Sequence, residues 1–237
     1  MTLTDDIFNL FNKELFCEKL KKDDFVKRTR PGKPEKYVFS CKHKRECYVD
    51  ENVHPIWTPA LGCDDSEVMV IGEAPSGAEE IGVHFGGLFS EWKNSKKSNV
   101  ISLKKWVEKY YGKKPYFTDL VKCGAENQQD KQILKIRIPL CEYILIQEIN
   151  YVRPKTIICL GNTAFYYVRK LKEDNKISAI EHIKKLTHYS GRAMLNISIK
   201  DKMNLIWEWQ ISSEYQKRKL AKEPLSKLSY FRKIKDD

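Results

Sequence analysis

Short apolar runs alternate with helical segments through the middle of the chain. Four runs predict strands, each bounded by glycine, proline or charged residues: 66–72, 115–123, 155–161 and 182–188. Apolar spacing of three to four residues predicts helices at 5–22, 102–111, 141–152, 162–173 and 200–221. Asn162 is placed to cap the helix that it opens.

This alternation predicts a parallel sheet with helices on both faces. The expected fold is α/β, a three-layer α/β/α sandwich with a central, mainly parallel four-stranded sheet. Ligands of such folds bind beyond the carboxyl ends of the strands. Four segments at those ends are therefore expected to line one cleft: 72–77, 119–123, 161–162 and 188–192.

Length and composition indicate one folded domain. The chain has 237 residues, of which 41% are hydrophobic, too many for a disordered protein. The expected domain spans 1–237, with an N-terminal helix and irregular segment at 1–40 and a C-terminal helix and basic tail at 200–237. No apolar run is long enough to cross a membrane, and the N-terminus lacks the pattern of a signal peptide. We therefore expect a cytoplasmic protein.

The formal net charge of +11 favours a polyanionic partner. A lysine-rich surface that binds no nucleic acid explains the charge equally well. Basic residues cluster at 42–46, 93–97, 216–222 and 231–235.

The seven cysteines fall into different surroundings. Cys159 lies in an apolar run and Cys17 on the apolar side of a helical segment, so both are expected in the core. The other candidates form two pairs in polar surroundings: Cys41 with Cys47, and Cys123 with Cys141. The two pairs can converge on one metal or iron–sulfur site, but neither has the CxxC spacing of zinc modules. Four unrelated thiols fit the spacing as well.

Four motifs resemble the uracil-DNA glycosylase superfamily, in particular its iron–sulfur-containing family four. They are GEAPSGAEEIGVHFGG (72–87), PYFTDLVKCG (115–124), CEYILIQEINYVRPKTIICLGNTAF (141–165) and THYSGRAML (187–195). They follow one another in the family's order within residues 41–195. The resemblance implies a uracil-DNA glycosylase-like fold, a hydrolase acting on N-glycosyl bonds, and DNA as the partner of a monomer.

The resemblance also implies a structural [4Fe–4S] cluster and no organic cofactor. The cluster ligands are expected at the family's four cysteine positions, Cys41, Cys47, Cys123 and Cys141. The first pair is spaced more widely than in the family, so Cys63 is an alternative ligand. Lys42 and Arg45 would then face a phosphate backbone.

The family's chemistry is hydrolysis of the bond between a flipped-out base and its deoxyribose. His188 is expected to donate a hydrogen bond to O2 of the leaving base, and a surface histidine is the alternative. Glu73 and Glu79 match the family's acidic residues, and one of them is expected to position the water. The alternative is that they form salt bridges or cap a helix. The resemblance also implies that Gly72 forms the turn beneath the sugar and that Phe85 stacks on the base. Ser190 and Arg192 are expected to contact the phosphates.

The sequence departs from the family where the base is read. The family reads uracil with an asparagine, and this chain has Asp119 there. A carboxylate accepts from an exocyclic amine but repels the O4 of uracil, which favours a cytosine-type base. Ser76 and the pair 86–87 leave room for a substituent at C5. Since removal of plain cytosine would destroy the host's own DNA, we expect a C5-modified cytosine of phage DNA and a role in antiviral defence.

Two alternatives remain at this point. One is an ordinary uracil-DNA glycosylase of base-excision repair, with Asp119 protonated. The other is a non-catalytic iron–sulfur or zinc protein that binds DNA. Lys122 is expected to face away from Asp119, so no lysine is placed to attack the sugar and the enzyme is expected to be monofunctional.

Overall fold

A computed structural model gives the fold. It describes residues 37–38, 41, 43, 45–47, 56–57, 62, 66–75, 99–123 and 131–186. The predicted helices at 5–22 and 200–221 lie outside these residues, and the single-domain assignment stays a prediction.

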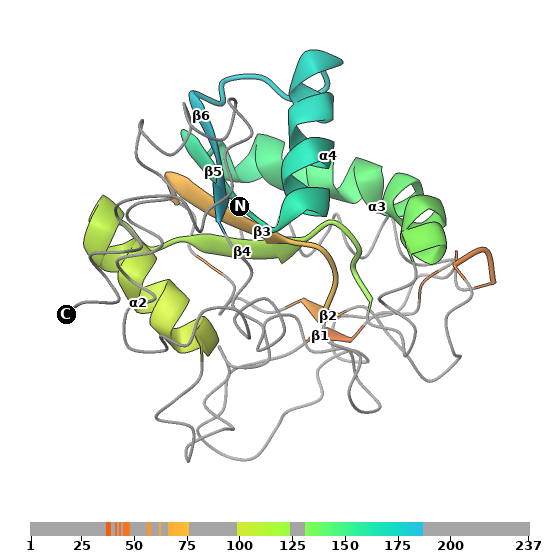
Figure 1. The fold of residues 1–237 in the computed structure, drawn as a ribbon, viewed down its shortest axis with the longest axis horizontal. Coiled ribbons are helices and arrows are strands. Elements are labelled where there is room, and N and C mark those ends of the chain that lie inside the picture. Colours follow the sequence, from red (N-terminus) through yellow and green to blue (C-terminus); the bar gives the residue numbers. More distant parts are fainter. Residues whose placement is uncertain are drawn as a thin grey trace, which may run out of the picture.

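A four-stranded parallel sheet forms the centre of the described part (Figure 1). Its strands run in the order β4-β3-β5-β6. Their bounds are β3 (Val68–Gly72), β4 (Tyr116–Asp119), β5 (Thr156–Leu160) and β6 (His182–Leu186). All three pairings between these strands are parallel, as the apolar runs predicted. A second, two-stranded antiparallel sheet joins β1 (Tyr37–Val38) and β2 (Ile56–Trp57). Its first strand, β1, lies in the segment 1–40, where irregular structure was predicted.

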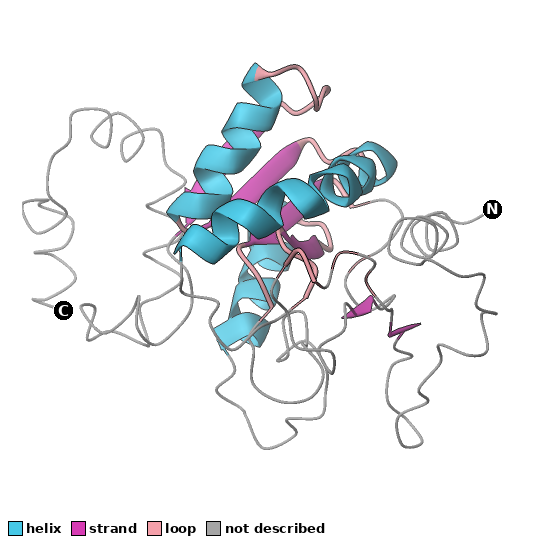
Figure 2. Ribbon diagram, turned by 90° about the vertical axis from the view of Figure 1, so that its right-hand side faces the viewer, coloured by secondary structure: helices cyan, strands magenta, loops and turns pink. Residues whose placement is uncertain are grey.

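Three described helices complete the layers. They are α2 (Asn99–Tyr111), α3 (Lys131–Val152) and α4 (Asn162–Glu173). The chain moves from β3 to β4 in one direction and from β4 across to β5 and on to β6 in the other. Right-handed crossovers therefore place α2 on one face and α3 and α4 on the opposite face. Figure 2 shows α3 and α4 together on one side of the sheet. The predicted three-layer α/β/α architecture is confirmed.

Helix α3 corrects one prediction, because it begins at Lys131 and not at residue 141. Residues 131–140, which were not predicted to be helical, are therefore part of the helix. Leu134, Ile138 and Cys141 are buried at the three- and four-residue spacing of one helix face. Pro139 lies inside the helix, on its exposed side.

The start of α4 corrects a second detail. Asn162 is the first residue of the helix, and the preceding Gly161 occupies the cap position with φ 89° and ψ −177°. That backbone conformation is open essentially to glycine alone. The side-chain oxygen of Asn162 accepts a hydrogen bond from Lys185 Nζ at 2.8 Å instead of capping the helix.

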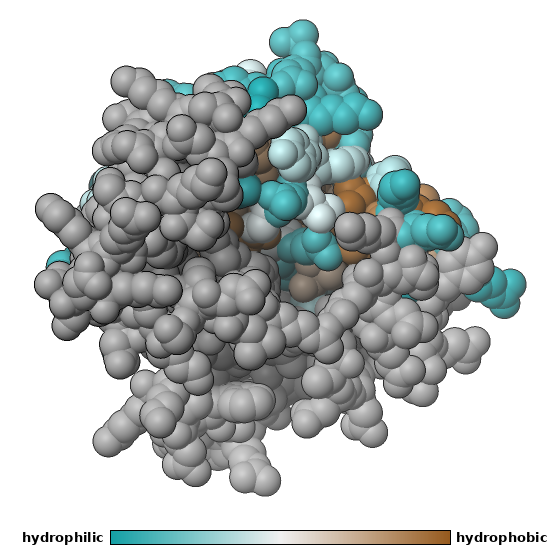
Figure 3. Space-filling view, in the orientation of Figure 1, coloured by the Kyte–Doolittle hydropathy of each residue, from teal (hydrophilic) through white to brown (hydrophobic). Residues whose placement is uncertain are grey.

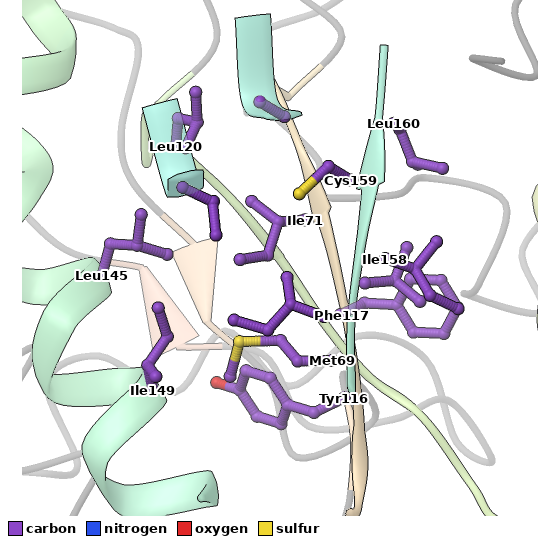
Figure 4. Packing of buried hydrophobic residues seen from close by; sticks show 14 of the residues in the cluster. Met69, Ile71, Tyr116, Phe117, Leu120, Leu145, Ile149, Ile158, Cys159 and Leu160 are labelled. Carbon is purple, nitrogen blue, oxygen red and sulfur yellow. The ribbon is translucent and has the colours of Figure 1, made fainter. Parts of the chain in front are cut away.

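The core lies between the sheet and its helices. Figure 4 shows Met69 and Ile71 of β3 near Leu145 and Ile149 of α3. Cys159 is fully buried in β5, as predicted. The described surface in Figure 3 is mainly hydrophilic, with smaller hydrophobic areas between the polar residues. None of the described helices has the length and apolar character needed to cross a membrane.

Candidate active site and cysteine cluster

The candidate site lies where the connections from the sheet diverge. The chain leaves β3 towards β4 on one side, while β5 lies on the other side of β3. Open α/β sheets bind ligands outside the strand ends at such a point. Gly72 ends β3 here, and Gly161 follows β5.

The turn after β3 is held against the segment after β4. Gly72 pairs in register with Asp119. Beyond the strands, the amide of Leu120 donates to Gly72 O at 3.0 Å and the amide of Val121 donates to Glu73 O at 3.1 Å. The structure therefore brings together Gly72, Glu73 and Asp119, as predicted for two adjacent strand ends.

Asp119 is 3% exposed and ends β4. The side chains of Tyr116 and Thr118 both donate to Glu148 of α3, so they face that helix. Because side chains alternate along a strand, Phe117 and Asp119 point to the opposite face. Asp119 is thus a buried carboxyl group at the edge of the predicted cleft.

Several predicted site residues lie outside the described residues. They are Ser76, Glu79, Phe85, His188, Ser190, Arg192 and Lys42, together with the alternative ligand Cys63. Arg45 is described and exposed, as a contact to a phosphate backbone requires. The roles of all these residues stay predictions.

The four candidate cysteine ligands lie near one another. Cys47, Cys123 and Cys141 are buried and Cys41 is half-buried. Burial, followed by the neighbouring thiols of Cys141 and Cys41, raises the pKa of Cys47 to about 12. Burial is also the main reason why the pKa of Cys123 is raised, and the other three thiols raise it further. Charges influence one another this way only at short range, so two segments distant in sequence converge here.

Backbone amides bind two of these sulfurs. The amide of His43 donates to Cys41 Sγ at 3.3 Å, and the Cys47 amide closes the same turn by donating to His43 O at 2.9 Å. Burial raises the pKa of Cys141 to about 11, although a hydrogen bond from the Lys122 amide lowers it. Such bonds to sulfur accompany thiolates that bind iron–sulfur clusters.

The four thiols are a donor set that two kinds of metal group use. Among the described residues, no three His, Cys, Asp or Glu side chains form a group that could hold a metal ion. Tetrahedral zinc requires all its sulfurs about 2.3 Å from one centre. In a [4Fe–4S] cluster each thiolate binds a different iron, so the sulfurs stand further apart. All-cysteine donor sets occur both at structural zinc sites and at [4Fe–4S] clusters, so the residues present fit either group.

Arg137 is a component of this region that the sequence had not indicated. It lies on α3 one turn before Cys141 and is 1% exposed. Its Nε donates to the main-chain oxygen of Cys47 at 2.7 Å. Its positive charge lowers the pKa of both Cys47 and Cys123, against the larger effect of burial. The available signal was its four-residue spacing from Cys141.

A buried ion pair was also missed. Lys122 Nζ lies 2.5 Å from Glu148 Oε2, and neither residue has measurable exposure. The ammonium group binds acceptors on the α3 side of β4, so Lys122 is held away from the predicted cleft. The ammonium group also binds the main-chain oxygen of Asp119 at 2.7 Å, and the absence of attack on the sugar stays a prediction.

Comparisons with known proteins identify the family. A family model described as the uracil DNA glycosylase superfamily matches residues 59–211. A type-4 uracil-DNA glycosylase of Archaeoglobus fulgidus is 23% identical over 164 residues, which are 68% of this chain and 77% of that protein. A type-4 uracil-DNA glycosylase of Saccharolobus solfataricus is 29% identical over 127 residues, or 53% of this chain and 54% of that protein.

One solved structure is also similar. The structure of wild-type SMUG2 from Pedobacter heparinus has a TM-score of 0.47 and 17% identity, and covers 94% of this chain and 100% of that chain. A likeness at this level carries no argument. The family match, which spans more than half of the chain, confirms the resemblance carried by the four motifs. The chain belongs to the uracil-DNA glycosylase superfamily and is a hydrolytic DNA glycosylase.

Proposed function

We propose that this glycosylase flips a C5-modified cytosine out of DNA and hydrolyses its N-glycosidic bond, leaving an abasic site. Hydroxymethylated and glucosylated cytosines of phage DNA are the expected bases, and antiviral defence is the expected role. The observation that carries the proposal is the buried Asp119 at the end of β4.

A buried carboxyl group discriminates strongly between bases. At 3% exposure, little water can come between Asp119 and a base placed against it. A carboxylate accepts from the N4 amine of cytosine, whereas the O4 of uracil offers only a second acceptor. Sites built on such hydrogen bonds reject the mismatched partner by about 10⁴–10⁵-fold.

The same pairing suggests a source for a proton. Cytosine N3 is itself an acceptor, so either Asp119 or the base must carry a proton when they meet. A proton held there would neutralise the base as it leaves with the bonding electrons. Bases leave more readily when their negative charge is stabilised in this way.

The preference for a substituent at C5 rests on the sequence. Ser76 and the glycines at 86–87 are small residues where a bulkier wall would exclude it. A host that contained plain cytosine would not survive an enzyme that removed it. A modified base found in invading DNA avoids this conflict.

The other residues take the roles expected from the family. His188 donates to O2 of the leaving base, Glu73 or Glu79 positions the water, and Phe85 stacks on the base. The contacts with the DNA backbone are assigned to Ser190, Arg192, Lys42 and Arg45. We propose that the enzyme acts as a monomer in the cytoplasm, associated with the nucleoid, and that it is a prokaryotic or viral protein.

We also propose that Cys41, Cys47, Cys123 and Cys141 hold a [4Fe–4S] cluster with a structural role. When bound, it would tie the turn at 41–47 to β4 and α3, and so hold Arg45 in place. The purified protein should be coloured, with an absorption band at roughly 400 nm, and should contain iron. A colourless protein loaded with zinc would contradict the assignment.

Mass spectrometry of released bases tests the proposed function. The full chain is incubated with phage DNA that carries modified cytosines, with the same sequence unmodified, and with uracil-containing DNA. We expect release of the modified base alone, and no release by the His188→Ala variant. Release of uracil alone would overturn the proposal.

The second candidate is an ordinary uracil-DNA glycosylase of base-excision repair. It is favoured by the names of the two curated relatives. In that case Asp119 would bind uracil in its protonated form, and Asp119→Asn would keep or raise the activity. The same base-release experiment distinguishes the two candidates.

A further inference from the structure

A buried ion pair stands behind the base-reading strand and takes no part in the chemistry described above. Lys122 of the segment after β4 and Glu148 of α3 are both fully buried. Their charged atoms, Nζ and Oε2, lie 2.5 Å apart. Removing two charges from water is costly, so such a pair requires hydrogen bonds on its remaining positions.

The hydrogen bonds of the pair are complete on the lysine side. An ammonium group has three donors, and Lys122 Nζ contacts three acceptors. They are Glu148 Oε2, Thr118 Oγ1 at 2.7 Å and the main-chain oxygen of Asp119 at 2.7 Å. Glu148 also accepts from the hydroxyls of Tyr116 at 3.1 Å and Thr118 at 2.9 Å. Three hydrogen bonds therefore fix the position of the Lys122 ammonium group.

Lys122 joins the two functional regions of the site. Its side chain binds the main chain of Asp119, which reads the base in the proposed function. Its own amide donates to the sulfur of Cys141. The neighbouring Cys123 is another candidate cluster ligand. A shift of Lys122 would therefore move both the base-reading residue and a ligand.

Stability alone does not explain the pair. Replacing a buried ion pair by neutral side chains of similar volume is often neutral or stabilising. The pair nevertheless lies fully buried between the end of β4 and α3, and binds groups of both strand and helix. Charged hydrogen bonds impose directions on the groups that they join, which apolar packing does not.

We infer that Lys122 and Glu148 are positioning residues that hold the end of β4, so that Asp119 meets the flipped base in one geometry while Cys141 keeps its place. This inference rests on the proposed function of Asp119 as the base-reading residue. The pair acts through Asp119 and does not touch the base.

The decisive variant is the double substitution Lys122→Met/Glu148→Gln in the full chain. It removes both charges, keeps similar volumes and leaves Tyr116 and Thr118 an amide oxygen to bind. The single substitutions leave one charge buried alone and are expected to fold poorly. The matched control is Lys176→Met/Glu142→Gln, which removes a partly exposed ion pair of 2.6 Å at the same helix.

Two measurements follow the position of β4. Hydrogen exchange of the peptide around 116–123 reports the amides of Leu120 and Val121, which bind the turn after β3. Single-turnover kinetics give the rate of base release apart from binding. We expect exchange of these amides to become about tenfold faster. The rate of base release should fall about 100-fold, because a misplacement of about 1 Å can slow a reaction by that factor. Substrate affinity and the melting temperature should change little, and the control should match the wild type.

A double variant with wild-type exchange at 120–121 and a wild-type rate would overturn the inference. So would a loss of affinity and rate together in the control. If the wild-type protein releases no base from any DNA tested, the proposed function fails. Hydrogen exchange then still decides whether the pair holds the end of β4.

Discussion

The two edges of the central sheet differ in what they do with charge. At the β4 edge all four strand residues are buried, among them the charged Asp119, and three further charged side chains are buried nearby: Lys122, Arg137 and Glu148. At the β6 edge His182 is exposed, and the residues up to Lys185 are only partly buried.

The difference lies in the free energy needed to remove the charges from water. Lysines on an open edge strand stay largely solvated, and they discourage pairing with other chains. Lys184 and Lys185 of β6 fit this purpose. Charges buried at the other edge are expensive and persist only when hydrogen bonds hold them. The buried β4 edge, called the covered edge below in contrast to the open β6 edge, carries the proposed base-reading residue and the candidate cluster ligands.

The largest effect is expected from Asp119→Asn at the covered edge. An amide can donate to O4 and accept from N3–H, so it reads uracil in place of cytosine. Excision of the modified cytosine should fall by about 10⁴-fold, while excision of uracil rises. Single-turnover rates on two oligonucleotides that differ only in the base measure both. Asp174→Asn, on an exposed residue after α4, is the control and should change neither rate. An unchanged rate on modified cytosine would contradict the base-reading role.

The next effect is expected from Arg137→Met. The substitution removes the hydrogen bond to Cys47 O and the positive charge beside the thiols. The free energy of unfolding should fall by about 3 kcal/mol, and the iron content should fall with it. Urea denaturation and the absorbance at roughly 400 nm measure the two effects.

Arg169→Met is the control for that experiment. Arg169 is 49% exposed and pairs with Glu173 on the surface of α4, so its loss should cost no more than about 0.5 kcal/mol. If Arg137→Met retained wild-type iron content and stability, Arg137 would have no role at the covered edge.

Gly62→Ala tests how tightly the covered edge is packed. A β-carbon at residue 62 would lie 2.7 Å from the Cα of Tyr116, closer than real β-carbons approach. We expect a loss of about 2 kcal/mol in urea denaturation. Gly112→Ala is the matched substitution, because nothing lies within 4 Å of that position and only its φ of 67° opposes alanine. It should cost about 1 kcal/mol, and an equal cost at both sites would argue against close packing at residue 62.

The smallest effect is expected at the open edge. Lys185→Ala removes the 2.8 Å contact with Asn162, which lies on the surface. The free energy of unfolding should change by less than about 0.5 kcal/mol. A larger loss would show that the two edges are less different than their burial indicates.

The sequence predicted the sheet well, because strands buried on both faces read as continuous apolar runs. It predicted the first half of α3 wrongly, since basic residues and Pro139 in that stretch resemble a loop. Only packing against the sheet and the cysteine turn makes Leu134 and Arg137 the buried side of a helix.

The site could be predicted in part. Asp119 and the four cysteines were predicted from their places in the family's pattern. The structure buries Asp119 at the end of β4 and brings the four cysteines near one another, while their roles stay predictions. Lys122 and Glu148 were not identified as a pair, because they are 26 residues apart and sequence does not distinguish buried charges from solvated ones. The reasoning from strand alternation was also inapplicable to Lys122, since β4 ends at Asp119.

The buried thiol of Cys159 gives this protein a built-in reporter. It lies in β5, with β3 and β6 on either side, and burial raises its pKa well above the ordinary value. An alkylating reagent reacts with thiolate, so it can reach this sulfur only when the sheet opens. The labelling rate of Cys159 therefore measures global unfolding, in the same sample in which the other thiols report whether their ligand sites are occupied.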